Sequence, residues 1–223
     1  MSQAVLEILP WAIFVSFSPL AMTAVILMLM TPRAMSNAMA MVVGWILSLA
    51  LIVIIADFIV MAGGHYARGK ENATLVTLRL VLGCLLLLGG FLASRRLKRR
   101  QGKVSQPRWI GKIDSITPRG AFVLGVSLAD VKNLIMAFAA VSGIVYSSHR
   151  TLDNVAVLAV FVLVGSLGVV WPLGLYVLKG EQVKASLARS RDWLLANNAK
   201  IMVILLFVFG AALLAQGIYG LVT

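Results

Sequence analysis

Residues 127–140, SLADVKNLIMAFAA, place an acid, a base and an amide inside an otherwise apolar run. If the helix begins near Arg119, Lys132 lies roughly 20 Å along its axis, slightly beyond the middle of a bilayer. Ionisable side chains at that depth are costly unless they meet a partner or water, so they face the interior of a bundle or a cavity. Asp130, Lys132 and Asn133 therefore predict either a static ion pair between helices or a polar site for a ligand or ion.

The spacing within this cluster constrains the helix that carries it. Residues two apart on a regular α-helix point roughly 200° apart, so Asp130 and Lys132 cannot share a face, whereas Asp130 and Asn133 can. Either the helix presents two polar surfaces or it unwinds at this point. Helices broken near the midplane recur in transporters, where the freed backbone groups line the substrate site.

A second irregular point lies in the first apolar run, where FVSFSPLAM places Ser16, Ser18 and Pro19 near mid-membrane. Proline removes a helical hydrogen bond and clashes with the preceding turn, and nearby serines help to satisfy the freed groups. The expected spans that carry the two irregular points run in opposite directions. We therefore expect Ser18 and Pro19 to face the 130–133 cluster across a central polar site.

The ionisable side chains of the cluster suggest roles in such a site. Lys132 carries a compact charge on a flexible stem, which suits a phosphate, sulfate or carboxylate headgroup. Asp130 would be the counter-charge of the empty site, which requires local unwinding, and a candidate proton acceptor that couples transport to a proton gradient. An acid–base pair that can neutralise itself would lower the cost of reorienting the empty carrier.

Two further charges lie in apolar runs. Asp57 is near the end of the second run, and Arg79 is near the start of the third. Because a short loop joins these runs, we expect neighbouring helices and an Asp57–Arg79 pair. The pair would be either structural or part of an outer gate or a proton-linked switch.

The elements that position these residues are expected to be transmembrane helices. The chain is 61% hydrophobic and 13% charged, whereas soluble domains average about 25% charged residues. A bilayer-spanning helix needs about 20 apolar residues, and six runs approach that length. We therefore predict an all-α membrane protein with six transmembrane helices, over residues 8–30, 36–62, 73–94, 119–145, 155–178 and 201–222.

The basic residues predict how these helices are oriented. Of the 20 basic residues, 15 fall on one side of the expected bundle, at Arg33, between residues 95 and 119, and between residues 179 and 200. By the positive-inside rule this side is cytoplasmic, so both termini lie outside the inner (plasma) membrane.

Three spans, a long basic loop and three more spans are the layout of two inverted repeats. The expected organisation is a first three-helix repeat over residues 1–94, a basic cytoplasmic loop over residues 95–117, and a second three-helix repeat over residues 118–223. The second repeat includes a short interfacial helix around residues 182–197, whose mainly apolar face is flanked by basic residues.

We expect neither an enzyme nor a metal or cofactor site. His65 and His149 fall in expected outer loops without cysteine or acid neighbours at metal-ligand spacing, and the chain has no P-loop. The stretch RRLKRRQGK is expected to fix topology and to attract anionic membrane lipids. A nucleic-acid partner is not expected, because no aromatic residues for base stacking are interleaved with these cations.

Three short motifs carry a family resemblance: Ser18-Pro19, Gly44-Trp45 and Lys132-Asn133-Leu134. They resemble the peptidoglycolipid addressing protein (GAP, Sap-like) family of the lysine exporter (LysE) superfamily, and the resemblance covers essentially the whole chain. The fourth-span motif of that family reads Asn-Pro-Lys-Asn, whereas residues 130–133 here read Asp-Val-Lys-Asn. The change removes a helix-breaking proline and adds a titratable group.

The resemblance implies an exporter of cell-envelope lipids or glycolipids in an actinobacterium. We expect a secondary transporter or flippase that carries an amphipathic envelope lipid or glycolipid across the inner membrane, with proton coupling as an option. Two alternatives stay open, export of a small amino acid or ion, and a role as accessory subunit of a larger lipid exporter. The sequence also leaves a homo-oligomer open.

Overall fold

The protein is described by a computed structural model, which places residues 2–62, 73–99, 110, 113, 115–147 and 151–222. These residues form helices and short connections, and no β-strand occurs among them. In chain order the elements are α1 (Ser2–Ser16), α2 (Pro19–Leu29), α3 (Ala34–Ala62), α4 (Ala73–Arg99), α5 (Pro118–Leu128), α6 (Val131–Ser147), α7 (Thr151–Lys179), the 3₁₀ turn η2 (Gly180–Val183) and α8 (Lys184–Val222). The expected all-α class is confirmed for these residues.

The length and apolar composition of the helices make this a multi-pass membrane protein. Three helical stretches could each cross a bilayer, namely Ala34–Val60, Val76–Lys98 and a 67-residue run over Val155–Leu221. Two bent helix pairs, α1–α2 and α5–α6, raise the number of candidate spans to five if each pair crosses as one broken span. Large apolar side chains on the outer faces of α3, α4, α7 and α8 are exposed, as lipid-facing surfaces require.

Two helices are broken where the sequence places its irregular points. The axes of α1 and α2 differ by 53°, and those of α5 and α6 differ by 56°. Pro19 begins α2 and Ser18 before it is extended, so the proline accounts for the first break. In the second break Ala129 is extended, and the Asp130 carboxylate accepts a hydrogen bond of 3.3 Å from the backbone N–H of Asn133. Of the two alternatives for this segment, the structure shows local unwinding, achieved by an aspartate cap without a proline.

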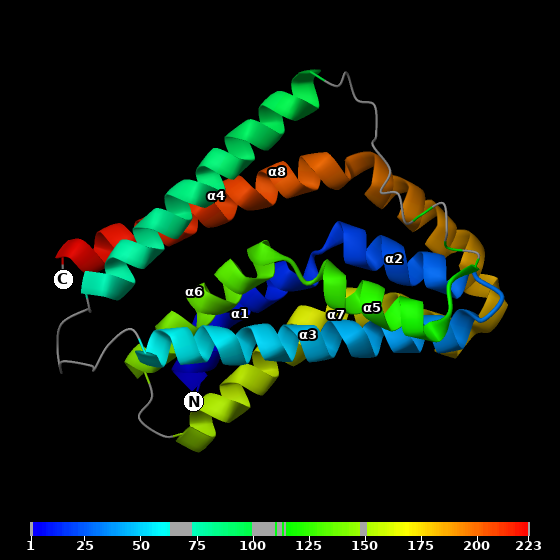
Figure 1. The fold of residues 1–223 in the computed structure, drawn as a ribbon, viewed down its shortest axis with the longest axis horizontal. Helices are drawn as coiled ribbons and strands as arrows, with labels where there is room; N and C mark the ends of the chain where they lie inside the picture. The colour runs from blue at the N-terminus through cyan, green and yellow to red at the C-terminus, as the bar shows by residue number, and fades with distance from the viewer. Residues whose placement is uncertain are drawn as a thin grey trace.

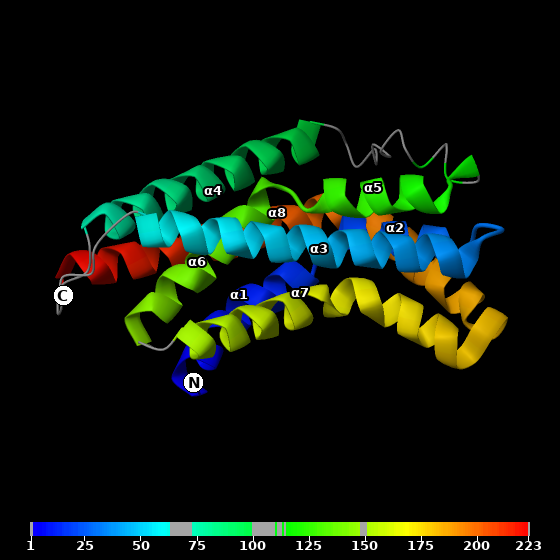
Figure 2. The ribbon, with the colours of Figure 1, turned by 60° about the horizontal axis from the view of Figure 1, so that its bottom comes forward.

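The halves of the broken helices run to opposite ends of the molecule. From the two breaks near the middle, α2 leads toward one end and α6 toward the other (Figure 1). The N- and C-termini lie at the α6 end, whereas α3, α5 and α8 begin at the opposite end, as both views show (Figures 1 and 2). In the core, α3 packs against α5, α6 and α7, and α1 packs against α6 and α7. Outside this core, α4 packs mainly along α8.

Glycine allows two of these helix pairs to approach closely. A Cβ atom at Gly125 of α5 would collide with the Met41 carbonyl oxygen of α3, and one at Gly168 of α7 would collide with the Ser16 carbonyl oxygen. The Gly168 N–H also donates to the Ser16 hydroxyl at 2.8 Å. Ser16 therefore fixes the end of α1 against α7, directly before the first break.

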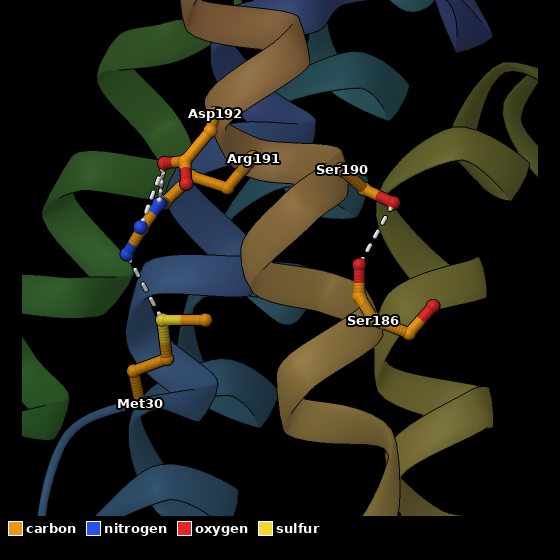
Figure 3. A network of polar contacts seen from close by, with 5 residues as sticks. All are labelled: Met30, Ser186, Ser190, Arg191 and Asp192. Atoms are coloured by element: carbon orange, nitrogen blue, oxygen red, sulfur yellow. Dashed lines mark hydrogen bonds and ion pairs between the residues drawn. The ribbon is translucent and has the colours of Figure 1, made fainter.

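The segment around residues 182–197, expected to be a separate interfacial helix, is the first part of α8. This helix continues from Lys184 to Val222 and changes direction along its length (Figure 1). Leu187 and Leu194 on its inner face are buried, as the predicted apolar face requires. Arg191 pairs with Asp192 at 2.7 Å and donates to the Met30 sulfur at 3.2 Å, so this part of α8 contacts the end of α2 (Figure 3).

Candidate functional site

The two helix breaks meet at a central cavity of about 210 Å³. Its lining includes residues from three places in the chain: Ser18 and Pro19 at the start of α2, Ser127, Asp130 and Lys132 around the second break, and Asn198 on α8. Four of the five residues that the sequence analysis assigned to a central site therefore line one cavity. The fifth, Asn133, is fully buried and bonded to Lys132.

Lys132 lines this cavity and has one hydrogen-bond partner among the described residues. Its ammonium group donates to the Asn133 side-chain oxygen at 3.2 Å. In the described part of the chain no ion pair joins Lys132 to Asp130. An ammonium group has three donors, and among the described residues only one of them meets a hydrogen-bond partner, which leaves donors for a ligand or water.

Asn133 has an unmet hydrogen-bonding group beside that lysine. Its side-chain Nδ2 is buried and has no partner among the described residues, although its Oδ1 accepts from Lys132. Buried polar atoms are satisfied in most native structures, so an orphan donor calls for an explanation such as a ligand or water. Asn133 does not line the cavity, so the donor that reaches a ligand there is the Lys132 ammonium group.

Asp130 has a structural role that accounts for its place in the sequence. Its carboxylate and its backbone carbonyl both accept from the Asn133 N–H, at 3.3 Å and 2.9 Å. The residue therefore caps the N-terminus of α6 while also lining the cavity.

The helix ends strengthen the preference of the cavity for negative charge. α2 begins at Pro19 and α6 begins at Val131, so both present N-terminal ends to the same space. The N-terminus of a helix carries a partial positive charge and unpaired N–H groups, which suit anions. The Ser18 side chain makes no capping bond to α2, which leaves its hydroxyl for other partners. Together with Lys132, these helix ends favour an anionic group, whereas the Asp130 carboxylate at the start of α6 opposes one.

Asn198 is a lining residue that the sequence analysis missed. Its Oδ1 is buried without a partner among the described residues, whereas the adjacent Asn197 donates to the Trp193 carbonyl oxygen at 2.9 Å. The only signal in the sequence is the Asn-Asn pair before the last apolar run. That signal could not reveal which asparagine points inward, because this depends on how α8 packs against α2.

The structure does not bring Asp57 and Arg79 together. Arg79 is 5% exposed, and its guanidinium donates to the Ser142 hydroxyl at 3.2 and 3.3 Å and to the Ser142 carbonyl oxygen at 3.2 Å. Asp57 is half-buried on α3 and forms no ion pair with Arg79 in the described chain. The physical reason is the position of α4, which packs along α8 instead of along the preceding helix α3.

Comparison with known proteins identifies the family. No curated protein and no solved structure matches the chain. The family model SfLAP, described as "Sap, sulfolipid-1-addressing protein", matches residues 8–219. The Sap-like resemblance of the short motifs is confirmed at this level. With nearly its whole length matched, the chain belongs to the Sap, sulfolipid-1-addressing protein family.

Proposed function

We propose that this protein is a secondary transporter that exports an anionic, amphipathic envelope lipid across the inner membrane through the central cavity. The observation that carries the proposal is the convergence of two broken helices on Lys132, which has no carboxylate partner there. Half-helix N-termini directed at anionic groups are a recurring substrate-site design in transporters. The family description names a sulfolipid, and an anionic headgroup on such a lipid would match the Lys132 charge in this cavity.

The proposed framework is six spans in two inverted repeats, and the proposed placement is the lysine exporter superfamily that the short motifs resemble. The run over Val155–Leu221 counts as two spans, because its 67 residues would be roughly 100 Å long as one helix. Gly180, with a φ of 58°, lies between them. If the first repeat (α1–α4) is exchanged with the second (α5–α8), α3 corresponds to α7 and α5 corresponds to α1. The α3–α5 packing then corresponds to the α7–α1 packing, and each pair has a glycine at its closest approach. The basic loops then place the termini outside.

In this proposal the headgroup binds between the two breaks. Lys132 supplies the positive charge, the Ser18 hydroxyl and the N-terminal ends of α2 and α6 supply hydrogen bonds and partial charge, and the orphan Asn133 amide lies behind the lysine. The acyl chains remain outside the cavity, because about 210 Å³ holds a headgroup and not a whole lipid. Asp130 lines the same cavity and is the proton acceptor that this proposal assigns to the coupling of transport to a proton gradient.

Reconstituted transport tests this function. The purified full-length protein would be placed in phosphatidylcholine liposomes with a fluorescent sulfate-bearing lipid, and movement between leaflets would be followed by quenching from outside. We expect movement faster than in protein-free liposomes and abolished by Lys132→Ala. Lys200→Ala removes a lysine outside this cavity and is the matched control.

Two outcomes would contradict the proposal. If the wild-type protein moved no lipid alone and did so only with a co-purified larger exporter, it would be an accessory subunit. If Lys132→Ala moved the lipid at the wild-type rate, the central cavity would not be the substrate site.

A further inference from the structure

The two walls of the central cavity belong to helices that do not pack along each other. Met202 on α8 lines one wall, and Leu128 and Lys132 at the α5–α6 break line the other. Among the described residues α8 packs along α2 and α4, α5 packs mainly against α3, and α6 packs mainly against α1 and α3. Neither α5 nor α6 packs along α8 within this part of the chain, so no helix crossing closes the cavity on that side.

The cavity reaches the surface of the protein at the α5–α6 break. Ser127 and Asp130 line the cavity and are also exposed. Val123 lies one turn before Ser127 on the same face of α5 and is 64% exposed. Val131, directly after Asp130, is 72% exposed. The exposed surface of the break therefore has a polar middle that continues the cavity and apolar residues before and after it.

Polar groups exposed at this depth require a polar partner. The break lies in the middle of a proposed span, far from the headgroup layers of the bilayer. A hydroxyl or carboxylate facing lipid chains there is costly, so such groups face water or a polar ligand. An amphiphile meets both conditions at once, because its headgroup contacts the polar residues and its chain contacts the apolar ones.

The size of the cavity determines where the chain of such an amphiphile lies. About 210 Å³ holds a headgroup, so the chain has to leave the cavity. On the α5–α6 side the exposed residues Ser127 and Asp130 lead out of the cavity, and exposed valines adjoin them. On the opposite side Ser18 and Pro19 are buried, and α2 packs along α8. The chain therefore leaves between α8 and the α5–α6 break.

We propose that the space between α8 and the α5–α6 break is a lateral entrance to the central cavity, through which the chain of the bound amphiphile extends into the bilayer core. That the headgroup is anionic and binds at Lys132 rests on the proposed function. The entrance itself rests on the exposure of Ser127 and Asp130 and on the packing of α8. With this entrance, a small cavity serves a large lipid, because the chains never enter the protein.

Photolabelling locates the chain directly. The full-length protein in phosphatidylcholine nanodiscs would bind a decyl sulfate that carries a diazirine in the first part of its chain, and labelled residues would be identified by mass spectrometry of peptides. The same experiment with excess unlabelled decyl sulfate separates specific from background labelling. We expect suppressible labelling at Val123, Val131 and Met202. Leu163 and Leu167 on α7, which are 69% and 57% exposed, report the background and should show no suppression.

Two controls test the role of the charge. Lys132→Gln should remove the suppressible labelling, whereas Lys200→Gln changes a lysine outside the cavity and should retain it. A diazirine probe with the same chain and a trimethylammonium head should label the α5–α6 break no more than α7. If Lys132→Gln does not fold, the suppression by decyl sulfate in the wild type and the ammonium probe still decide the outcome.

A second copy of this chain is the other candidate for covering this surface. Val123→Cys in the Cys84→Ser background would be oxidised in native membranes, and we expect no disulfide-linked dimer. A dimer that forms efficiently there, with Leu163→Cys as the matched control on α7, would overturn the entrance in favour of an interface between copies.

Other results would also overturn it. Labelling at Val123, Val131 and Met202 that decyl sulfate does not suppress would show that no chain leaves the cavity at this point. If the protein moved lipid in liposomes without suppressible labelling, the proposed function would stand and the entrance would not. Suppressible labelling in a protein that moves no lipid would contradict the proposed function and leave the entrance standing.

Discussion

At the scale of single residues, the short stretch at 130–133 combines three roles. Asp130 ends the unwound segment by capping α6, Lys132 brings a positive charge to the cavity, and Asn133 lies behind that lysine with one buried donor unmatched. A carboxylate is not the only side chain that can cap a helix, since asparagine does so about equally well. The acid at this position therefore offers a titratable group beyond its structural role.

Substitutions at Asp130 should separate these two roles. Asp130→Asn keeps an acceptor for the Asn133 N–H, so we expect a melting temperature close to the wild type and transport that depends less on pH. Asp130→Ala removes the cap and should lower stability by about 1 kcal/mol. Thermal unfolding and transport over a pH series would measure both. Wild-type pH dependence in Asp130→Asn would exclude Asp130 as the coupling group.

The polar residues of the site could be predicted from the sequence only in part. Ser18, Pro19, Asp130 and Lys132 stood out because charges and a proline are costly inside apolar runs, and all four line the central cavity. Asn198 did not stand out, because an amide beside a basic loop is ordinary in sequence and becomes buried only through the packing of α8.

At the scale of helices, the two breaks and the close helix crossings are connected. Ser16 ends α1 directly before the first break, and its hydroxyl accepts the Gly168 N–H of α7 at 2.8 Å. That contact requires the two backbones to approach closely, which only glycine at residue 168 permits. The position of the central cavity therefore depends on the close contact between α1 and α7 at Ser16 and Gly168, just outside the cavity.

A pair of glycines on α7 allows this dependence to be measured. Gly168→Ala places a methyl group against the Ser16 backbone and should destabilise the protein by about 1–3 kcal/mol. Gly174→Ala meets no atom within 4 Å and should be neutral or slightly stabilising, because alanine has the higher helix propensity. Thermal unfolding of both variants in the same detergent is the measurement. Equal melting temperatures would show that the crossing is looser than described.

Sequence patterns predicted only part of the arrangement of the helices. Apolar length and the proline predicted the membrane helices and the first break, and polar spacing left unwinding of α5–α6 as one of two alternatives. The partner of α4 was not predictable from connectivity, since this helix pairs with α8 through interleaved residues such as Gly83 and Leu214, and Gly217 and Leu80. The expected Asp57–Arg79 pair assumed that helices adjacent in sequence are neighbours, which a bundle does not require.

At the scale of the whole molecule, charge and cavities are distributed along one axis. Three of the described cations, Arg33, Lys179 and Lys184, lie at the end where α3 and α8 begin, opposite the termini (Figures 1 and 2). The central cavity lies at the helix breaks. A larger cavity of about 660 Å³, with Trp11, Ala139 and Ala212 among its lining residues, lies at the end that holds the termini. In the proposed function, this order corresponds to a route from the basic side to the terminal side.

The orientation of that route can be tested by labelling from one side. Val104 lies in the basic loop, outside the described residues, and Val104→Cys in a Cys84→Ser background gives one reactive thiol. We expect a membrane-impermeant maleimide to label it in inside-out vesicles and not in intact cells. Labelling in intact cells would reverse the proposed direction of transport.

The most direct test of the central claim is the reactivity of a thiol inside the central cavity. Ser18→Cys in the Cys84→Ser background would be treated with a charged methanethiosulfonate reagent from each side of the membrane, with and without decyl sulfate. For an alternating-access site we predict modification from either side under different proton gradients, and protection by decyl sulfate that disappears in Lys132→Gln. A thiol that is unreactive from both sides, or whose reactivity ignores both decyl sulfate and Lys132, would contradict a transport site at the two helix breaks.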